Sequence, residues 1–384
     1  MNCRLLILWK YLQFIILFLI VIFLNGSCTR LKKNNSDYNY LNFLKSIIPV
    51  NKFVSDNYNP LLFKYFFDKN SKKEFFTYYN QKESCICFIN VNDTIVVNKF
   101  FLKGIDKIND YVVFNSDSII VLSEPSDLFT LTHENKYSFE LTDSIPEYKH
   151  NFYLSSFFGY PISSYGNELL IYNFPGEVLN NKTKLKKYFA TSRDLHLQLI
   201  HNEIKITELT GRYPDYYKEN NFYVYCPTRT IGADGNLIYS FDDSPNIFLY
   251  DSVLKNYEEK TLTTPDFKEN VSFDESKIYD HNYITKYYIE NDRFLNLIYN
   301  PNKHVYYRIF SKGISYENDD GTINRDKPFT VLIYDSSFNL KNQISFPAKK
   351  YKNLIIYITK ENELLITNDE YEKGNTSLHA FDFN

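Results

Sequence analysis

A cysteine at position 28 is the residue whose surroundings point most directly to chemistry. It follows an apolar run from Tyr11 to Leu24 and the small residues of Asn25-Gly26-Ser27, and Arg4 and Lys10 give the segment a positive start. This three-part layout is typical of a secretory signal peptide. In a bacterial lipobox, a cysteine directly after small residues is acylated and the chain is cut before it. We therefore predict lipidation of Cys28.

Two other interpretations of this segment remain open. A permanent membrane-spanning helix needs about 20 apolar residues, and a run counted back to Leu5 reaches that length only by burying Lys10 and Gln13. A simple cleaved signal would leave Cys28 unmodified. The lipobox pattern also has a Leu-like residue where this sequence has Asn25. Asn25 is therefore the position at which the sequence departs from the lipobox pattern on which the lipidation prediction rests.

A second candidate site is the loop sequence Gly211-Arg212-Tyr213-Pro214-Asp215-Tyr216-Tyr217. Its mixture of aromatic and charged side chains suits a surface that binds a glycan or a peptide. The residues predicted to contact such a ligand are Arg212, Tyr213, Tyr216 and Tyr217. The alternative is a strand that ends at the proline, with its tyrosines packed at the edge of a sheet.

Motifs for catalysis are missing from the sequence. It has no G-x-S-x-G nucleophile elbow, no P-loop and no dinucleotide glycine fingerprint. Asp280-His281, followed by Arg293, could supply a base and the group that orients it, but no nucleophile lies nearby in sequence and a polar turn is the favoured interpretation. We predict no catalytic residue and no cofactor.

The candidate metal ligands are equally weak. His196 and His201 are five positions apart, so on one strand they face opposite sides. Asn318-Asp319-Asp320-Gly321 resembles the centre of a calcium loop, but Tyr316 stands where an acidic ligand is needed. We therefore predict a hairpin turn there and no metal site.

Composition favours β structure and disfavours nucleic acid as a partner. The chain has 35 Tyr and 33 Phe but only 11 Gly, and aromatic residues favour strands. An AT-rich genome gives the same bias, so the count alone does not indicate a sugar-binding surface. Loss of the signal segment moves the formal net charge from −3 to −5, and no basic stretch interleaved with aromatic residues follows.

The remaining cysteines indicate no disulfide framework. After Cys28 only Cys85, Cys87 and Cys226 follow, an odd number. Cys85 and Cys87 would point to the same face of a strand, with Cα atoms about 6.5–7 Å apart, which is poor for a bond between them. We predict that both are buried as small hydrophobic residues.

The rest of the chain divides into a tether and one domain. Residues 1–27 form the signal peptide, residues 28–45 a polar and basic tether, and residues 46–384 a single domain of short strands separated by polar turns. The strongest helix candidate is short, Lys182–Phe189. Polar turns that open strands recur roughly every 50 to 70 residues, which fits four-stranded blades. We predict an all-β fold, a β-propeller of six or seven blades, with two β-sandwich domains as the alternative.

A series of motifs in the C-terminal part carries a family resemblance. It includes Tyr287-Tyr288-Ile289, the segment from Asn300 to Phe310, the segment from Lys327 to Leu340, and Asn362-Glu363-Leu364-Leu365-Ile366. With the lipobox in front, the chain resembles an uncharacterised family of Gram-negative lipoproteins, the domain of unknown function 4221. The resemblance implies a propeller-like fold and no known reaction, so it transfers no active-site residue.

Together these observations predict a lipid-anchored protein of the cell envelope. Its N-terminal lipid would contact the outer membrane from the periplasmic side, because Thr29 is not an inner-membrane retention Asp and basic residues follow it. The predicted function is non-catalytic binding or scaffolding, with a protein, peptide or glycan as ligand. The alternative is a glycan hydrolase with carboxylates from several blades, which would place two carboxyl groups about 5–10 Å apart in one pocket.

Overall fold

The computed structural model describes residues 40–49, 62–92, 95–105, 107–123, 127–132, 136–140, 152–155, 161–175, 189–190, 192–200, 203–219, 222–223, 227–370 and 375–383. The signal segment, Cys28, His201 and Cys226 lie outside these residues, as does the Lys182–Phe189 helix candidate except for Phe189. The predictions made for them stay predictions.

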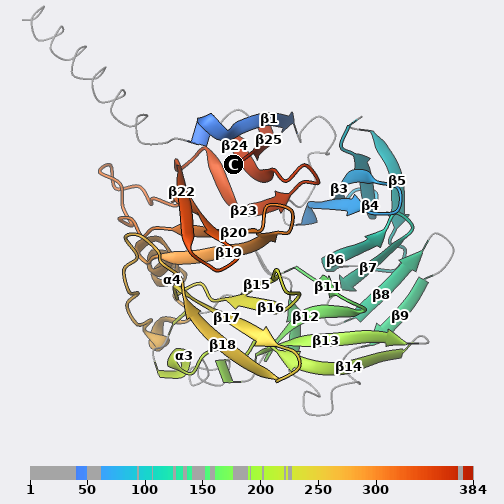
Figure 1. Ribbon diagram of the computed structural model, residues 1–384, viewed down its shortest axis with the longest axis horizontal. Helices are drawn as coiled ribbons and strands as arrows, with labels where there is room; N and C mark the ends of the chain where they lie inside the picture. Colours follow the sequence, from blue (N-terminus) through green and yellow to red (C-terminus); the bar gives the residue numbers. More distant parts are fainter. Residues whose placement is uncertain are drawn as a thin grey trace, which may run out of the picture.

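The described chain forms six antiparallel sheets arranged around a common centre, as Figure 1 shows. Blade one consists of β2 (Lys64–Asp68), β3 (Lys73–Asn80), β4 (Cys85–Asn90) and β5 (Val96–Phe101). Blade two consists of β6 (Ile108–Asn115), β7 (Ser118–Ser123), β8 (Asp127–Thr132) and β9 (Lys136–Glu140). Blade three consists of β10 (Phe152–Ser155), β11 (Ser163–Tyr165), β12 (Glu168–Pro175), β13 (Arg193–Ile200) and β14 (Glu203–Thr210). In blade three, β10 and β11 both pair with β12.

Blades four and five have four consecutive strands each, and blade six combines the two ends of the described chain. Blade four consists of β15 (Thr228–Ile231), β16 (Leu237–Ser240), β17 (Asn246–Asp251) and β18 (Asn256–Thr261). Blade five consists of β19 (Arg293–Asn300), β20 (Val305–Ser311), β21 (Phe329–Asp335) and β22 (Leu340–Phe346). Blade six consists of β23 (Tyr351–Ile358), β24 (Leu364–Glu370), β25 (Asn375–Phe381) and β1 (Leu44–Pro49). β1 pairs antiparallel with β25, with Leu44 opposite Phe381. The ring is therefore closed by hydrogen bonds between the first and last strands, drawn in blue and red in Figure 1.

The core consists of layers of side chains between neighbouring blades. Among the described residues there are six buried hydrophobic clusters, each shared by two consecutive blades, with the last and first blades sharing one as well. A blade in a ring is covered on both faces, so its middle strands are apolar at nearly every position. β4 shows this pattern, because all of Cys85–Ile89 is buried.

This architecture confirms the all-β propeller prediction and sets the blade number at six; two β-sandwiches is wrong. Two apolar runs of the sequence, Val305–Phe310 and Thr330–Tyr334, lie within β20 and β21, which pair antiparallel. A turn follows β21, in which the Asn339 N–H donates to Asp335 Oδ1 at 2.8 Å.

The helical segments in the described part of the chain are short and lie outside the sheets. They are η1 (Tyr40–Phe43), α3 (Tyr216–Glu219), η7 (Glu275–Lys277) and α4 (His281–Glu290). The expectation of a polar turn at Asp280-His281 is wrong, because Asp280 is the N-cap of α4 and accepts from the N–H groups of Asn282 and Tyr283. Such capping satisfies helix N–H groups that lack partners within the helix. None of the helices in the described part of the chain has the length and apolar character needed to cross a bilayer.

Candidate functional site

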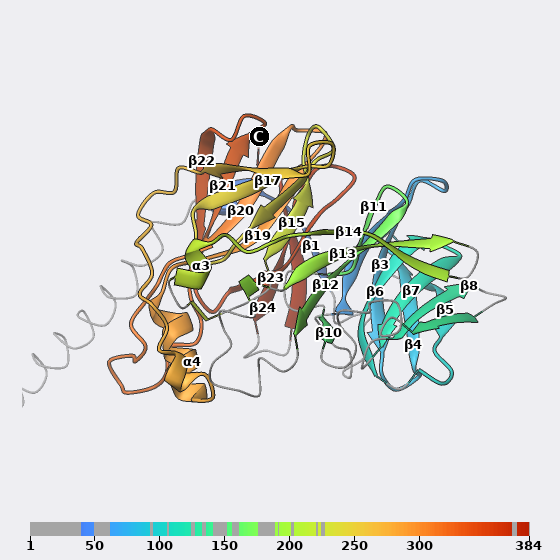
Figure 2. The ribbon, with the colours of Figure 1, turned by 90° about the horizontal axis from the view of Figure 1, so that it is seen from below.

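Four connections between strands meet beside α3 and α4, and we call the surface that they form the loop face. They comprise the described residues of the connection between β14 and β15 (211–219, 222–223 and 227), together with residues 241–245, 262–292 and 312–328. In a propeller, the connections from one blade to the next and from the second to the third strand of a blade lie on the same face. Both overall views draw α3 and α4 on the same side of the molecule, near blades four and five (Figures 1 and 2).

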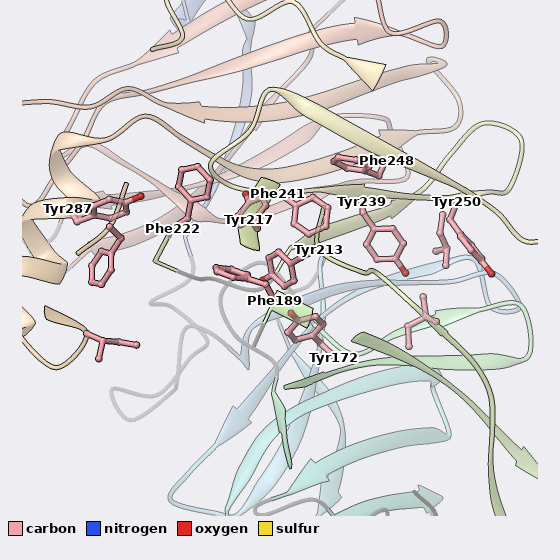
Figure 3. Close-up of a cluster of buried hydrophobic side chains, with 14 residues drawn as sticks. Tyr172, Phe189, Tyr213, Tyr217, Phe222, Tyr239, Phe241, Phe248, Tyr250 and Tyr287 are labelled. Carbon is pink, nitrogen blue, oxygen red and sulfur yellow. The ribbon is translucent and has the colours of Figure 1, made fainter. Parts of the chain in front are cut away.

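An aromatic cluster fills the space beneath this part of the loop face. Figure 3 shows its side chains, which come from blades three and four and from the connections around α3 and α4. Tyr213 is 4.9 Å from Phe241 and 5.2 Å from Tyr217 between ring centroids. Edge and tilted contacts at such distances are favourable for aromatic rings.

The cluster corrects the predicted ligand surface. Tyr213 and Tyr217 are 0% exposed, so they are core residues that a ligand cannot contact. Tyr216 is partly buried, with its hydroxyl inside the protein, whereas Arg212 is exposed. The alternative interpretation is right that tyrosines of this sequence are packed inside the protein, but β14 ends at Thr210, before the proline, and Tyr216 and Tyr217 lie in α3. Gly211 has φ +68°, and a Cβ there would lie 2.9 Å from the Tyr239 ring.

Charged side chains above the aromatic cluster hold the connections together. We call Asp242, Asp243, Asn270, Asp292, Arg293 and Lys327 the loop-face cluster. The Arg293 guanidinium pairs with the Asp242 carboxylate and lies 4.0 Å from the centroid of the Tyr288 ring. Buried charges of this kind are tolerated in proteins when they are paired and hydrogen-bonded.

Asp292 ties its own connection, residues 262–292, to the connection of residues 312–328. Its carboxylate accepts from the Lys268 N–H at 2.8 Å and from the Gly313 N–H at 2.7 Å. Gly313 approaches the end of α4 so closely that a Cβ would lie 2.1 Å from the carbonyl oxygen of Glu290. Only glycine therefore fits at this position.

Asp243 has a carboxylate oxygen with an unfilled bonding position. Its side chain is 5% exposed, and Oδ1 accepts from Asn270 Nδ2 at 2.8 Å, while Oδ2 has no hydrogen-bond partner in the described structure. Burial raises the pKa of Asp243 to about 7, and the Asn270 hydrogen bond and the charge of Lys327 oppose this shift. The carboxyl group is therefore held neutral at pH values where an ordinary aspartate is ionised.

Lys327 is a buried basic residue in the same cluster as Asp243. Its ammonium donates to the carbonyl oxygens of Tyr288 and Asn291, at 3.0 and 2.7 Å. Burial, reinforced by the charge of Arg293, lowers the pKa of Lys327 to about 7. A buried acid and a buried base in one cluster therefore titrate near neutrality, an arrangement that is common at functional sites and also occurs in structural ion-pair networks.

A fully buried arginine supports the same connections from below. Arg308 on β20 is 0% exposed and donates to Pro245 O at 2.6 Å, Ser244 O at 2.8 Å and Ser240 Oγ at 2.8 Å. Its guanidinium lies 3.8 Å from the centroid of the Phe294 ring. These three acceptors are neutral, and Arg308 fixes the turn that carries Asp242 and Asp243.

A second polar network joins blades three and four. Glu168 Oε2 lies 2.8 Å from His196 Nδ1, and His196 Nε2 lies 2.8 Å from Thr210 Oγ1. This carboxylate–imidazole–hydroxyl order resembles a hydrolase triad. Thr210 is nevertheless 0% exposed, and its Oγ1 also contacts the Tyr239 hydroxyl at 2.6 Å. The network therefore links blades three and four through hydrogen bonds.

The other candidates behave as structural residues. Asp320 Oδ1 accepts from the Thr322 N–H at 2.9 Å within an exposed turn, which confirms the hairpin turn at Asn318–Gly321. Within the described ranges, no group of three or more His, Cys, Asp or Glu side chains is placed to hold a metal ion. Sequence reasoning gave no role to Asp243, Lys327 and Arg308. Arg308 and Lys327 lie in segments that carry the family resemblance, but no sequence motif links them to Asp243 of blade four.

Comparisons with known proteins support the fold and give no activity. A family model described as domain of unknown function (DUF4221) matches residues 50–341. The chain is similar to the crystal structure of a DUF4221 family member from Bacteroides vulgatus, with 16% identity, a TM-score of 0.66, and 88% of this chain and 97% of that chain covered. No curated protein matches the chain.

More distant similarity extends to two named propellers. A virginiamycin B lyase from Staphylococcus aureus shares 11% identity at a TM-score of 0.43, covering 88% of this chain and 99% of that chain. A regucalcin from Agrobacterium tumefaciens shares 10% at a TM-score of 0.45, with 88% and 96% covered. Similarity at this level does not transfer function. The family match covers most of the sequence, and the chain belongs to the DUF4221 family.

Proposed function

We propose that this protein is a lipid-anchored propeller of the cell envelope, which binds a protein, peptide or glycan with its loop face and carries out no catalysis. The supporting observation is the internal bonding of that face. Asp292 fixes the connections at Lys268 and Gly313, and Arg308 fixes the turn before β17. A surface that is rigid before binding loses less conformational entropy when a ligand binds.

Exposed side chains on the same connections are the proposed contact residues. Val271 is 65% and Tyr279 is 50% exposed, and Arg212 is exposed as well. Aromatic residues and arginine are enriched at protein interfaces and among the residues that contribute most binding energy. The proposal keeps Arg212 from the predicted surface and replaces the buried tyrosines with Tyr279 and Val271.

A photo-crosslinking residue at position 279 tests the binding face. We expect a specific adduct in intact cells when the crosslinker replaces Tyr279. The matched control replaces Tyr137, a 39% exposed tyrosine on β9 in blade two. Adducts of equal yield from both positions, or from neither, would argue against a binding site on the loop face.

The rival function, a glycan hydrolase, has one observation in its favour. A carboxyl group that stays protonated near pH 7, as in Asp243, suits a general acid. Release of reducing ends from a polysaccharide panel, abolished in Asp243→Asn protein of unchanged fold, would replace the binding proposal with this one.

Lipid attachment has its own test at Cys28. Replacing Cys28 with Ser should move the protein from the membrane fraction to soluble or uncleaved forms and abolish palmitate labelling. Each buried CH₂ of an acyl chain contributes about 0.8 kcal/mol, so loss of the chains removes most of the membrane affinity. Cys226→Ser serves as the control and should keep the label. A Cys28→Ser protein that is still labelled and membrane-bound would disprove lipidation at this residue.

A further inference from the structure

Two cysteines lie in contact at the interface that closes the ring. Cys85 and Cys87 point to the same side of β4, and their Sγ atoms are 3.6 Å apart. Both are 0% exposed and belong to the cluster shared by blades one and six. Their burial confirms the prediction from the sequence. The short distance between the sulfurs also places both within reach of a single metal ion.

The strand geometry favours a bridging ion over a disulfide. A disulfide needs sulfurs about 2.05 Å apart and Cα atoms usually within about 6.8 Å. Residues two apart on an extended strand hold their Cα atoms at about 6.5–7 Å, with parallel side chains. Metal–sulfur bonds of about 2.3 Å can join sulfurs up to about 4.6 Å apart. The observed 3.6 Å lies within this second range without movement of the backbone.

We propose that Cys85 and Cys87 form a two-thiolate site for a soft d¹⁰ monovalent cation such as Cu(I) or Ag(I). On binding, both S–H bonds break, two protons pass to solvent and two sulfur–metal bonds form. The oxidation states of metal and sulfur do not change. Thiolate ligands favour soft metal ions, and Cu(I) is one of them.

The coordination number follows from the surroundings of the pair. In the part of the chain that the structure describes, no third His, Cys, Asp or Glu joins the two cysteines in a metal-binding group. A structural zinc site almost always has four ligands, so the pair does not meet the needs of Zn²⁺. Two thiolates alone suit a two-coordinate Cu(I) or Ag(I) complex. With bonds of about 2.3 Å, the 3.6 Å separation gives a strongly bent complex, and rotation of the cysteine side chains until the sulfurs are about 4.6 Å apart would make it linear.

Glu83 and Lys99 lie at the edge of the cysteine pair, where they provide a balancing charge and a route by which the ion reaches the sulfurs. Their side chains form a 2.5 Å ion pair and are 43% and 35% exposed, and Glu83 Oε2 is 3.9 Å from Cys85 Sγ. A bis-thiolate complex with a monovalent cation carries one negative charge, which the Lys99 ammonium partly balances. Rotation of these partly exposed side chains gives an ion a route to the sulfurs.

Cu(I) titration of the full-length protein, reduced and kept free of oxygen, tests the site. In competition with a chromophoric Cu(I) chelator, we expect one ion per chain with two released protons and a sulfur-to-metal absorption band in the ultraviolet. X-ray absorption should show two sulfur neighbours. Failure to compete with the chelator, or three or more sulfur neighbours, would overturn the proposal.

Alanine variants of the two cysteines test whether the ion binds at Cys85 and Cys87. Cys85→Ala and Cys87→Ala should each weaken Cu(I) binding at least about 100-fold, while Cys226→Ala should leave it unchanged. Circular dichroism spectra establish that each variant is folded, and the X-ray absorption of the wild-type protein gives an answer that needs no variant. Undiminished binding to the Cys85→Ala/Cys87→Ala double variant would place the ion elsewhere and refute the proposed site.

Discussion

Replacement of Asp243 with Asn is expected to stabilise the protein at pH 8 and to leave its stability nearly unchanged at pH 4. The pKa of Asp243 is raised from 3.8 to about 7 by burial. Between these pH values the folded protein binds more protons than the unfolded chain, so the carboxyl group lowers the free energy of unfolding as pH rises. One pKa unit corresponds to about 1.4 kcal/mol, so we expect a gain of about 4 kcal/mol above pH 7. Asn keeps the oxygen that accepts from Asn270.

Urea unfolding of the variant and the wild type across pH 4 to 8 measures this difference. Asp266→Asn is the matched control, because the Asp266 side chain is 79% exposed. Its free energy of unfolding should change by less than about 0.5 kcal/mol at every pH. A stability difference for Asp243→Asn that does not grow with pH would show that the carboxyl group is already ionised in the folded protein at pH 4.

Arg308→Ala should cause the largest loss of stability, about 3–5 kcal/mol in the free energy of unfolding. The change removes the Arg308 donors to Ser244 O, Pro245 O and Ser240 Oγ. Pro245 O keeps the N–H of Leu262 as a donor, whereas Ser244 O and Ser240 Oγ lose the guanidinium that they face in the interior. The change also leaves a cavity between blades four and five, which adds to the loss. Because the turn with Asp242 and Asp243 is released, hydrogen exchange of its amides should accelerate.

Equilibrium unfolding in urea, with hydrogen exchange on the turn, checks this expectation. Arg212→Ala removes an exposed arginine and should have an effect within about 0.5 kcal/mol. Arg308→Lys keeps the charge but cannot donate in the same planar fork, so it should restore only part of the loss. Equal stability of Arg308→Ala and Arg212→Ala would mean that Arg308 does not support the turn.

The blade architecture could be predicted from sequence because each strand carries its own signal. Short apolar runs between polar turns, as at Val305–Phe310 and Thr330–Tyr334, lie within the strands observed. Burial on both faces makes such runs apolar without alternation. The blade number stayed at six or seven, because variable connections such as residues 262–292 obscure the repeat.

The site could not be predicted, because its parts come from segments far apart in sequence. Asp243 and Lys327 are ordinary surface-type residues until packing of blades four and five buries them. Tyr213 and Tyr217 look like exposed loop tyrosines in the sequence, but in the structure both are packed in the aromatic core cluster. α4 was missed because it is short and its helical pattern is weak, so that capping by Asp280 and packing of Tyr287 decide its formation.

The closure of blade six also determines how the molecule would respond to mechanical force. Any pull that arrives through the residues before Tyr40 acts first on β1, at the Leu44–Phe381 pair. The Lys45–Asp382 ion pair and the hydrogen bond from the Asp382 N–H to Phe43 O, at 3.0 Å, lie at the same end. Tension applied across the strand would peel β1 from β25 one pair at a time, while tension along the strand would load the pairs together. The direction of tension at this single strand therefore sets the force that opens the ring.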